Sequence, residues 1–168
     1  RLRIVGLVDV APAVLHPAAD ALGLPAEARF ADLAAADAAL IAGTVQADCC
    51  IIVIPPRHHR AAVELAAAHR LTILSEKPIA DTWEDVVAIR RAVAAAGVGM
   101  MVVQNYRYTA RILTLKGVLD GGEIGRPLYL VGRFAADYRV RLTWGAEFRH
   151  EMRHALLVEG AIHHFDQL

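Results

Sequence analysis

The sequence lacks the features that mark several common classes of protein. It has no excess of charge of either sign, because 18 Lys and Arg residues balance 18 Asp and Glu residues. Without a basic stripe, neither nucleic acid nor an anionic membrane surface is an expected partner. The longest apolar runs, at residues 49–56 and 98–103, are much shorter than the ~18 residues that predict a membrane span. We therefore expect a soluble, cytoplasmic protein that acts on a small molecule.

Lysine and cysteine are also scarce. Lys77 and Lys116 are the two lysines among 18 cationic residues, so each is a candidate for a specific role. Lysine is the cation whose pKa moves readily on burial. The two cysteines, Cys49 and Cys50, are adjacent within an apolar run, which favours two small core side chains over a disulfide framework. This pattern is typical of a reducing cytosol.

What the sequence does contain is an alternation of strand-like and helix-like segments. The predicted strands lie at residues 2–10, 49–54, 71–74 and 98–103, and the predicted helices at 12–22, 32–41, 60–70, 82–96 and 109–119. Pro12, Asp32 and Thr82 with Asp85 mark helix starts, and Gly97 marks a helix end. This order predicts an α/β fold with a doubly wound parallel sheet.

The pattern changes beyond residues 121–127, a segment rich in glycine that ends at Pro127. Residues 128–134 are strand-like, residues 137–153 are rich in Arg and aromatic side chains without a clear period, and residues 156–168 resume as a helix. We therefore predict one domain over residues 1–122 and the beginning of a second over 123–168. Because the chain starts at Arg1 without Met or a signal-peptide pattern, we expect it to be a fragment.

Asp9 ends the first predicted strand. In a dinucleotide-binding βαβ unit, an acid at this place accepts hydrogen bonds from the adenosine ribose, about 20 residues after a Gly-rich turn. Only eight residues precede Asp9, so that turn would lie upstream of Arg1. The following Val-Ala-Pro offers no Arg for a 2′-phosphate, which favours NAD over NADP. The alternative is a helix cap or a solvated loop acid.

Lys77 follows another predicted strand, within Ser75-Glu76-Lys77-Pro78. The carboxyl ends of parallel strands line the ligand crevice of such a sheet, and Pro78 imposes an extended or turn geometry on the residues before it. A lysine at a rim with apolar walls can transfer protons near neutral pH. The alternative is an exposed loop lysine.

Four of the eight histidines fall in the last nineteen residues. On a helix, Glu159 and His163 share one face, and Asp166 follows three residues later. A carboxylate beside an imidazole orients it and raises its pKa, as an acid/base histidine requires. Two alternatives remain at this point: a helix whose polar residues face solvent, and a metal site built from Glu159, His163 and His59.

Together these segments resemble the Gfo/Idh/MocA family of NAD(P)-dependent oxidoreductases over nearly the whole chain. The residues that carry the resemblance are, in order, Asp9 at its strand end, Ile54-Pro55-Pro56-Arg57-His58-His59, Glu76-Lys77-Pro78, Gln104-Asn105-Tyr106-Arg107-Tyr108, Gly122-Glu123-Ile124-Gly125-Arg126-Pro127, and Glu159-Gly160-Ala161-Ile162-His163-His164-Phe165-Asp166. Ile54 and Pro56 depart from the Thr and Asn of the family's Thr-Pro-Asn-x-x-His. Glu159 stands where many members have Asp.

The resemblance implies a role for each of these positions. Lys77, His163 and Glu159 would be catalytic, with a cis peptide bond between Lys77 and Pro78. Asp9, Pro55, His59, Glu76 and Lys77 would bind the NAD cofactor, whereas Asn105, Tyr106 and His163 would contact the substrate. The second domain would be an open, mainly antiparallel sheet that often forms an oligomer interface.

The implied function is the transfer of a hydride between NAD and a secondary alcohol of a sugar or cyclitol. The full-length protein would then be a homo-oligomeric dehydrogenase without a catalytic metal. A non-catalytic, dinucleotide-binding sensor or regulator with the same fold is the alternative. A metal-dependent hydrolase or lyase is a third possibility.

Overall fold

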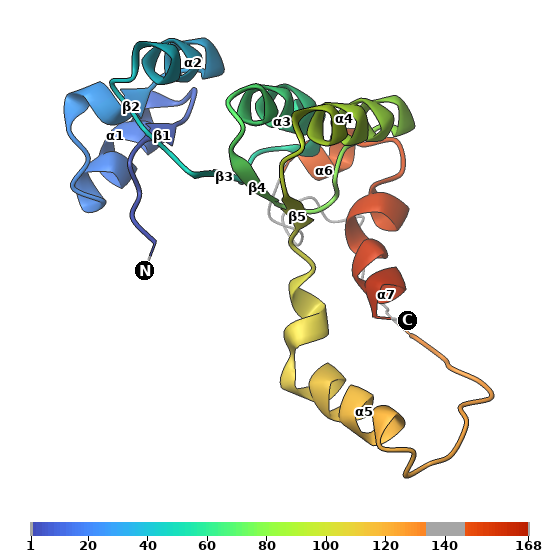
Figure 1. The fold of residues 1–168 in the computed structure, drawn as a ribbon. Coiled ribbons are helices and arrows are strands. Elements are labelled where there is room, and N and C mark those ends of the chain that lie inside the picture. Colours follow the sequence, from blue (N-terminus) through green and yellow to red (C-terminus); the bar gives the residue numbers. More distant parts are fainter. Residues whose placement is uncertain (1, 134–146, 168) are drawn as a thin grey trace.

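Short parallel strands alternate with helices through the first two thirds of the chain (Figure 1). The structure is a computed structural model that describes residues 2–133 and 147–167. Its strands are β1 (Leu7–Val8), β2 (Arg29–Phe30), β3 (Cys49–Ile52), β4 (Thr72–Ser75) and β5 (Met100–Val102). All pairings are parallel, which confirms the predicted α/β class.

The strands form two sheets, with the orders β1-β2 and β3-β4-β5. β4 is the central strand of the larger sheet, where Ile73 lies opposite Cys50 on one side and Met100 on the other. The single continuous sheet that we expected is therefore interrupted between β1 and β3 in the described part of the chain. Both β1 and β3 keep one edge without a strand partner there.

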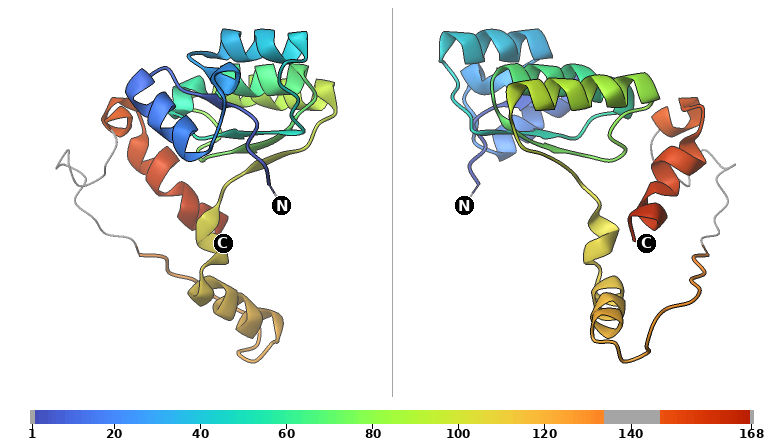
Figure 2. Two further views of the ribbon diagram at one scale, coloured as in Figure 1. Left: turned by 90° about the vertical axis from the view of Figure 1, so that its left-hand side faces the viewer. Right: turned by 45° about the vertical axis from the view of Figure 1, so that its right-hand side comes forward.

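The helices cover both faces of the strands. They are α1 (Pro12–Ala21), α2 (Leu33–Ala42), α3 (His59–Ala68) and α4 (Trp83–Ala96), with 3-10 turns η1 (Ala26–Ala28) and η2 (Pro56–His58) between them. Figure 2 shows α2, α3 and α4 in a row over one face, with α1 on the other. Helices on both faces are the arrangement expected for parallel strands joined by crossover helices.

The predicted capping residues occupy helix ends. Asp32 accepts a hydrogen bond from the Ala35 N–H at 2.8 Å, and the Thr82 hydroxyl accepts one from the Asp85 N–H at 3.2 Å. Gly97 ends α4 with a left-handed φ of 65°, a conformation that costs glycine little. These local signals fix the ends of α2 and α4, so the sequence placed both helices correctly.

The main core lies between the larger sheet and the pair of helices α3 and α4. Val63, Ile73 and Ile89 are fully buried there. Complete burial of one such side chain contributes about 1.5–3 kcal/mol. A smaller cluster, centred on Ala19, Leu24 and Ala28, holds α1 against the β1-β2 sheet. The candidate site residues Glu76 and Lys77, which follow β4, therefore lie next to the better-packed part of the molecule.

Three details of the predicted first part are wrong. The first strand was expected over residues 2–10, but its regular part is β1, only two residues long. β2 was missed, although it separates the two helices that we placed in succession. Cys49 is exposed, because it lies on β3, whose outer edge is open, and Cys50 is half-buried, so neither is a full core residue.

The segment from η3 (Asn105–Tyr108) to residue 133 turns away from the strands. After η3, α5 (Ala110–Asp120) leads through a glycine-rich turn into residues 128–133, which form no strand, contrary to the prediction for 128–134. Residues 134–146 lie outside the described residues; they include the last residue of the predicted strand and most of the predicted irregular segment. Hydrophobic side chains are exposed in this arm, with Leu128 at 91% and Tyr129 at 87%.

The last described segment returns to the carboxyl end of β4. It consists of α6 (Phe148–Glu151), a π-helical turn η4 (Leu156–Gly160) and α7 (Ile162–Asp166). The predicted continuous helix over 156–168 is thus broken near residue 161, and Leu168 lies outside the described residues. No helix in the described ranges is long and apolar enough to cross a bilayer.

Candidate active site

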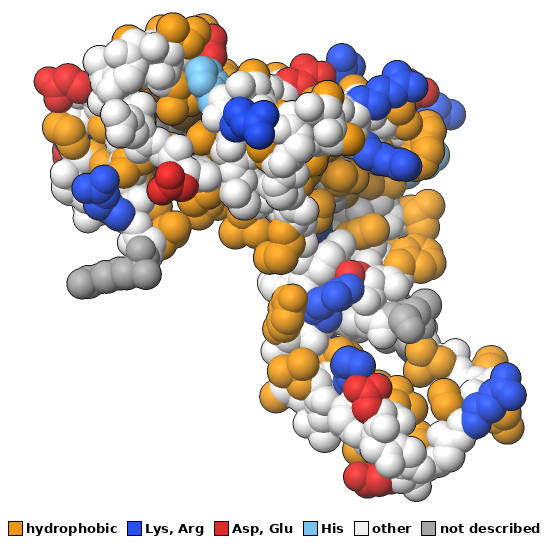
Figure 3. All heavy atoms as spheres, in the orientation of Figure 1, with side chains coloured by type: hydrophobic (Ala, Val, Ile, Leu, Met, Phe, Trp, Pro, Cys, Tyr) orange, Lys and Arg blue, Asp and Glu red, His pale blue; other side chains and the backbone are white. Residues whose placement is uncertain are grey.

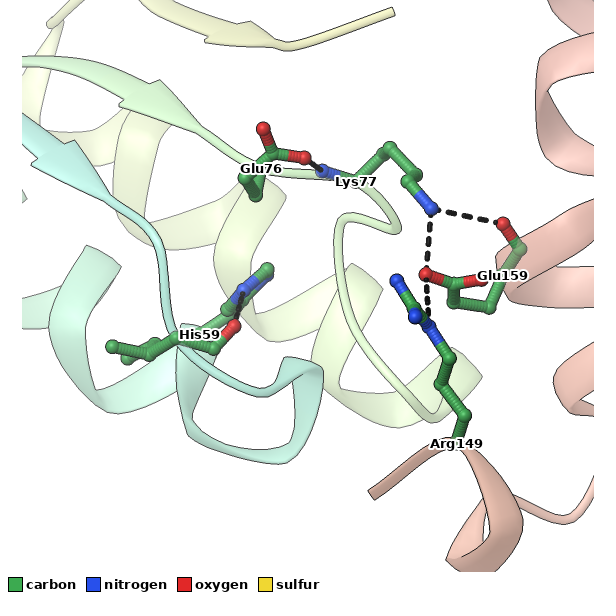
Figure 4. Close-up of polar contacts among 6 residues, drawn as sticks. His59, Glu76, Lys77, Arg149 and Glu159 are labelled. Atoms are coloured by element: carbon green, nitrogen blue, oxygen red, sulfur yellow. Dashed lines mark hydrogen bonds and ion pairs between the residues drawn. The ribbon is translucent and has the colours of Figure 1, made fainter. Parts of the chain in front are cut away.

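A buried ion-pair cluster joins the end of β4 to the C-terminal segment. Lys77 Nζ donates to Glu159 Oε1 at 2.6 Å and to the Glu159 backbone carbonyl at 3.1 Å. Arg149 Nε donates to the same carboxylate oxygen at 2.9 Å. Figure 4 shows that Lys77 reaches Glu159 from the loop after β4 and that Arg149 reaches it from a short helix of the C-terminal segment. Residues separated by 82 positions therefore meet in one polar cluster.

The carboxylate of Glu159 is almost completely enclosed, with 3% of its surface exposed. An ionised carboxylate at this depth requires paired charges, and Lys77 and Arg149 supply two. The π-helical turn places Glu159 at the inner side of its segment. The alternative in which the polar face of this helix points to solvent is wrong, since Glu159 and His163 are both buried.

The strand end fixes the backbone of Lys77. Ser75, the last residue of β4, is fully buried. A Glu76 carboxylate oxygen accepts a hydrogen bond from the Lys77 N–H at 3.2 Å, as Figure 4 shows. The Lys77–Pro78 peptide bond is cis, as the resemblance implies. The side chain of Lys77 is 13% exposed, so the exposed-loop alternative for this lysine is wrong.

His163 lies one helical turn beyond Glu159 but does not hydrogen-bond to it among the described contacts. Its ring stacks on Tyr106, with centroids 4.0 Å apart and planes inclined by 12°. It is 7% exposed, and its Nδ1 has no hydrogen-bond partner among the residues that the structure describes. Burial, followed by the nearby charge of Lys77, lowers the pKa of His163 below 6.5, and the opposing effect of Glu159 is smaller. The expected increase in this pKa is therefore wrong.

The His163 pKa moves down because Glu159 faces other partners. Its carboxylate is shared by Lys77 and Arg149, so little of its negative charge is left to stabilise an imidazolium. Desolvation, which disfavours the charged ring, then dominates. The consequence is a histidine that stays neutral, and able to accept a proton, at neutral pH.

His59 holds two strand-end loops together. Its Nε2 lies 2.8 Å from the Ile54 carbonyl, and its Nδ1 lies 3.3 Å from the Ile79 carbonyl, on the loop that carries Lys77. The residue is completely buried, and Figure 4 shows it to one side of the Lys77–Glu159 pair. With no exposed surface, His59 supports the walls of the expected cofactor channel and does not line them.

The remaining predicted site residues lie at three places. Asp9 follows β1, where its Oδ1 accepts a hydrogen bond from the Ala11 N–H at 2.8 Å, in the turn that precedes α1. Pro55 is half-buried just after β3, and Asn105 is exposed at the start of η3. The structure thus brings Lys77, Glu159, His163 and Tyr106 to one region and leaves Asp9 on the other sheet.

The proposed metal set is not assembled. Within residues 2–133 and 147–167, no group of three or more His, Cys, Asp or Glu side chains is placed to hold a metal ion. Both ring nitrogens of His59 lie close to backbone carbonyls, and Glu159 faces two cations.

Arg149 is the residue that sequence reasoning missed. It lies on the four-residue helix α6, in a stretch where no periodicity predicted a structure. Sixteen of the 18 cationic residues are Arg, so its type did not distinguish it. A search near Glu159 for cations that could pair with its carboxylate could have found Arg149.

The model of the Gfo/Idh/MocA oxidoreductases, described as an NAD-binding Rossmann fold, matches residues 1–104. The chain belongs to this family. It is 44% identical over 165 residues to the uncharacterized protein y4oX of Sinorhizobium fredii, covering 98% of the chain and 44% of that protein. It is 32% identical to the D-apiose dehydrogenase of Rhizobium rhizogenes, covering 97% of the chain and 45% of the enzyme.

Solved structures of the Gfo/Idh/MocA fold agree. An oxidoreductase from Agrobacterium radiobacter, crystallised with NAD+, L-tartaric acid and magnesium, matches with a TM-score of 0.64 and 33% identity, over 73% of this chain and 34% of that one. The chain thus spans less than half the length of the relatives that it matches.

Proposed function

We propose that this chain carries the cofactor-binding domain and part of the active site of an NAD-dependent dehydrogenase that oxidises a secondary alcohol of a sugar or cyclitol. The observation that carries the proposal is the pairing of Lys77 with the buried Glu159, close in sequence to a neutral, buried His163. The D-apiose dehydrogenase relative supports a sugar as the class of substrate.

The carboxyl edges of the strands supply groups that suit NAD. Asp9 presents a carboxylate after β1, where an acid can accept hydrogen bonds from an adenosine ribose. Pro55, Glu76 and Lys77 follow β3 and β4 at the same edge, supported from behind by His59. A bound NAD would supply the hydride acceptor for the oxidation, and the residues named above would hold it.

Lys77 and His163 have different roles at the substrate hydroxyl group. In the described part of the chain, Lys77 Nζ donates two of its three N–H bonds, both to Glu159, so one is left for the substrate oxygen. The neutral His163 ring accepts the proton that leaves this oxygen as the carbonyl forms. The positive charge of Lys77 stabilises negative charge that develops on the same oxygen.

Arg149 orients the Glu159 carboxylate that binds Lys77. Its guanidinium shares the carboxylate oxygen with Lys77, and its side chain is 24% exposed. Because Glu159 reaches one methylene further than Asp, it can bridge a lysine on the β4 loop and an arginine on α6. Arg149 is therefore a positioning residue in the proposed site.

The domain organisation is part of the same proposal. Residues 1–122 belong to the dinucleotide-binding domain and residues 123–168 begin the substrate domain. In the described part of the chain, β1 and β3 each keep one edge without a strand partner, which supports a dinucleotide-binding sheet that a further parallel strand would complete. Hydrophobic side chains near these edges are exposed, including Val10 at 80% and Val53 at 69%; Figure 3 shows orange side chains gathered beneath the layer of helices. Cytoplasmic location and homo-oligomerisation stay predictions.

The two lysines allow a matched test in the full-length gene product. Lys77→Met should reduce kcat for sugar oxidation about 10²- to 10³-fold, the usual cost of removing a donor that stabilises charge developing on the reacting oxygen. NAD affinity, measured by calorimetry, should change much less. Lys116→Met is the control, because Lys116 is exposed and pairs only with Asp120 among described residues, at 2.7 Å.

Two outcomes would contradict the proposal. If Lys77→Met oxidises every accepted sugar as fast as the wild-type enzyme, Lys77 has no role in the reaction. If the wild-type protein binds NAD tightly but oxidises no member of a broad panel of sugars and cyclitols, the non-catalytic sensor is the better assignment.

A further inference from the structure

Tyr106 and His163 form a close aromatic pair between two segments that are far apart in the sequence. Tyr106 lies on η3 and His163 on α7. Their ring centroids are 4.0 Å apart and their planes are inclined by only 12°, which describes a face-to-face stack with extensive contact. Tyr106 was expected to contact substrate, but the face it presents here is already covered by the imidazole.

A second contact fixes the same two segments. Arg107, the next residue on η3, donates from Nε and Nη2 to the two carboxylate oxygens of Asp166 at 2.9 and 2.5 Å. Asp166 lies at the end of α7, three residues after His163, and its side chain is 14% exposed. This two-pronged pair holds η3 against α7, so the stack of Tyr106 on His163 has a rigid frame.

The imidazole lacks the partner that usually orients a proton-transferring histidine. A carboxylate or backbone carbonyl normally accepts a hydrogen bond from one ring nitrogen and thereby fixes the ring. Here Nδ1 is buried without a partner among the described residues, and Glu159 gives its carboxylate to Lys77 and Arg149. Among the described residues, no hydrogen bond at Nδ1 therefore holds the plane of this ring.

We propose that Tyr106 is the positioning residue for His163, holding the imidazole plane by stacking so that the ring stays oriented for proton transfer. The proposal rests on the proposed dehydrogenase function and deepens it, because it moves Tyr106 from the substrate contacts to the support of the proton acceptor. The stacked face also removes water from one side of the ring.

The charges that surround His163 are consistent with this role. Lys77 and His164 disfavour its protonated form, whereas Glu159 and Glu76 favour it, and burial is the largest single influence on its pKa. A ring held by an apolar face in a dry position stays neutral without help from a carboxylate. Stacking therefore supplies the orientation, and burial supplies the protonation state.

The test compares two substitutions of Tyr106 in the full-length enzyme. Tyr106→Phe keeps the stacking face and should retain most of kcat, whereas Tyr106→Leu should lower kcat about tenfold or more at unchanged NAD affinity, the scale of effect expected when a reacting group is displaced by about 1 Å. KM for the sugar should change little in either variant. Tyr108→Leu is the matched control, since Tyr108 is on the same turn and 64% exposed.

Two kinetic results would overturn the proposal. If Tyr106→Leu raises KM for the sugar and leaves kcat unchanged, Tyr106 contacts substrate and does not position His163. If Tyr106→Phe loses as much kcat as Tyr106→Leu, the hydroxyl group matters and the stack does not.

An NMR measurement separates this proposal from the proposed function. With isotope-labelled histidine, the His163 ring protons should show an upfield ring-current shift that persists in Tyr106→Phe and disappears in Tyr106→Leu. This readout requires no activity, so it remains valid if the protein oxidises no sugar. An identical His163 resonance in all three proteins would show that the rings do not stack.

Discussion

The two sheets differ in how well their strands are paired and buried, and therefore in how rigidly they hold the residues that follow them. In the β3-β4-β5 sheet, the central strand is paired on both sides, and Ile73 is 1% exposed beneath α3 and α4. In the β1-β2 sheet, each strand pairs through two residues, and Leu7 and Val8 are only half-buried. Glu76 and Lys77 follow β4 of the larger sheet, and Asp9 follows β1 of the smaller one.

This difference matches the two tasks in the proposed function. Proton transfer depends on atoms held within a fraction of an ångström, and a strand paired on both edges supplies such a base for Lys77. Contact between Asp9 and a cofactor ribose tolerates more movement, and binding itself can order β1. The comparison teaches that the reactive groups lie on the part of the fold that is already rigid in this chain.

Core truncation should produce the largest contrast between the sheets. Ile73→Ala in the full-length protein should lower the free energy of unfolding by about 2–5 kcal/mol, because it leaves a cavity in a closed core. Leu7→Ala, at a half-buried position, should cost clearly less. Urea denaturation measures both, and equal losses would show that the two sheets are equally well packed.

Asp9 provides the next contrast, in cofactor affinity. Asp9→Asn keeps an oxygen that can accept from Ala11 but removes the charge, so the Kd for NAD should rise about ten- to a hundredfold, as expected for loss of about 1.5–3 kcal/mol from a charged hydrogen bond. Asp32→Asn is the control, because Asp32 Oδ1 likewise accepts a hydrogen bond from a backbone N–H at 2.8 Å. An unchanged Kd in Asp9→Asn would remove Asp9 from the cofactor site.

The smallest expected effect is a pH dependence of stability from His163. Its pKa in the folded protein lies below 6.5, so below that pH the unfolded chain binds the proton more readily than the native state. Stability should therefore fall as the pH drops below about 6.5, and His163→Asn should reduce this slope. Urea midpoints over roughly pH 5 to 8 measure it. His16→Asn, on the exposed face of α1, is the control; an unchanged slope in His163→Asn would contradict the burial argument.

Much of the fold followed from local signals in the sequence. Apolar runs located β3, β4 and β5, and capping residues such as Asp32 and Thr82 located helix starts, because strand burial and capping depend on residues that are neighbours in the chain. β2 could not be found in this way, since Arg29–Phe30 is too short to show a period. Its existence depends on pairing with β1.

The candidate site was only partly predictable for the same reason. The motifs identified Lys77, Glu159 and His163, but they placed the carboxylate on the wrong partner. An ideal helix puts Glu159 beside His163, whereas the π-helical turn at 156–160 and the cations at positions 77 and 149 direct it toward Lys77. The stack of Tyr106 on His163 joins segments 57 residues apart, and no spacing in the sequence reports such a contact.

The central claim is that Lys77 and Glu159 act as one unit in the proposed reaction, and a double-mutant cycle on kcat/KM tests it most directly. The cycle uses Lys77→Met, Glu159→Gln and the double variant of the full-length enzyme, with a sugar that the wild type oxidises. Groups that act together show strongly non-additive losses. We expect the double variant to lose about as much kcat/KM as the more damaging single variant. Losses that multiply would show that the two residues act independently and would contradict the account.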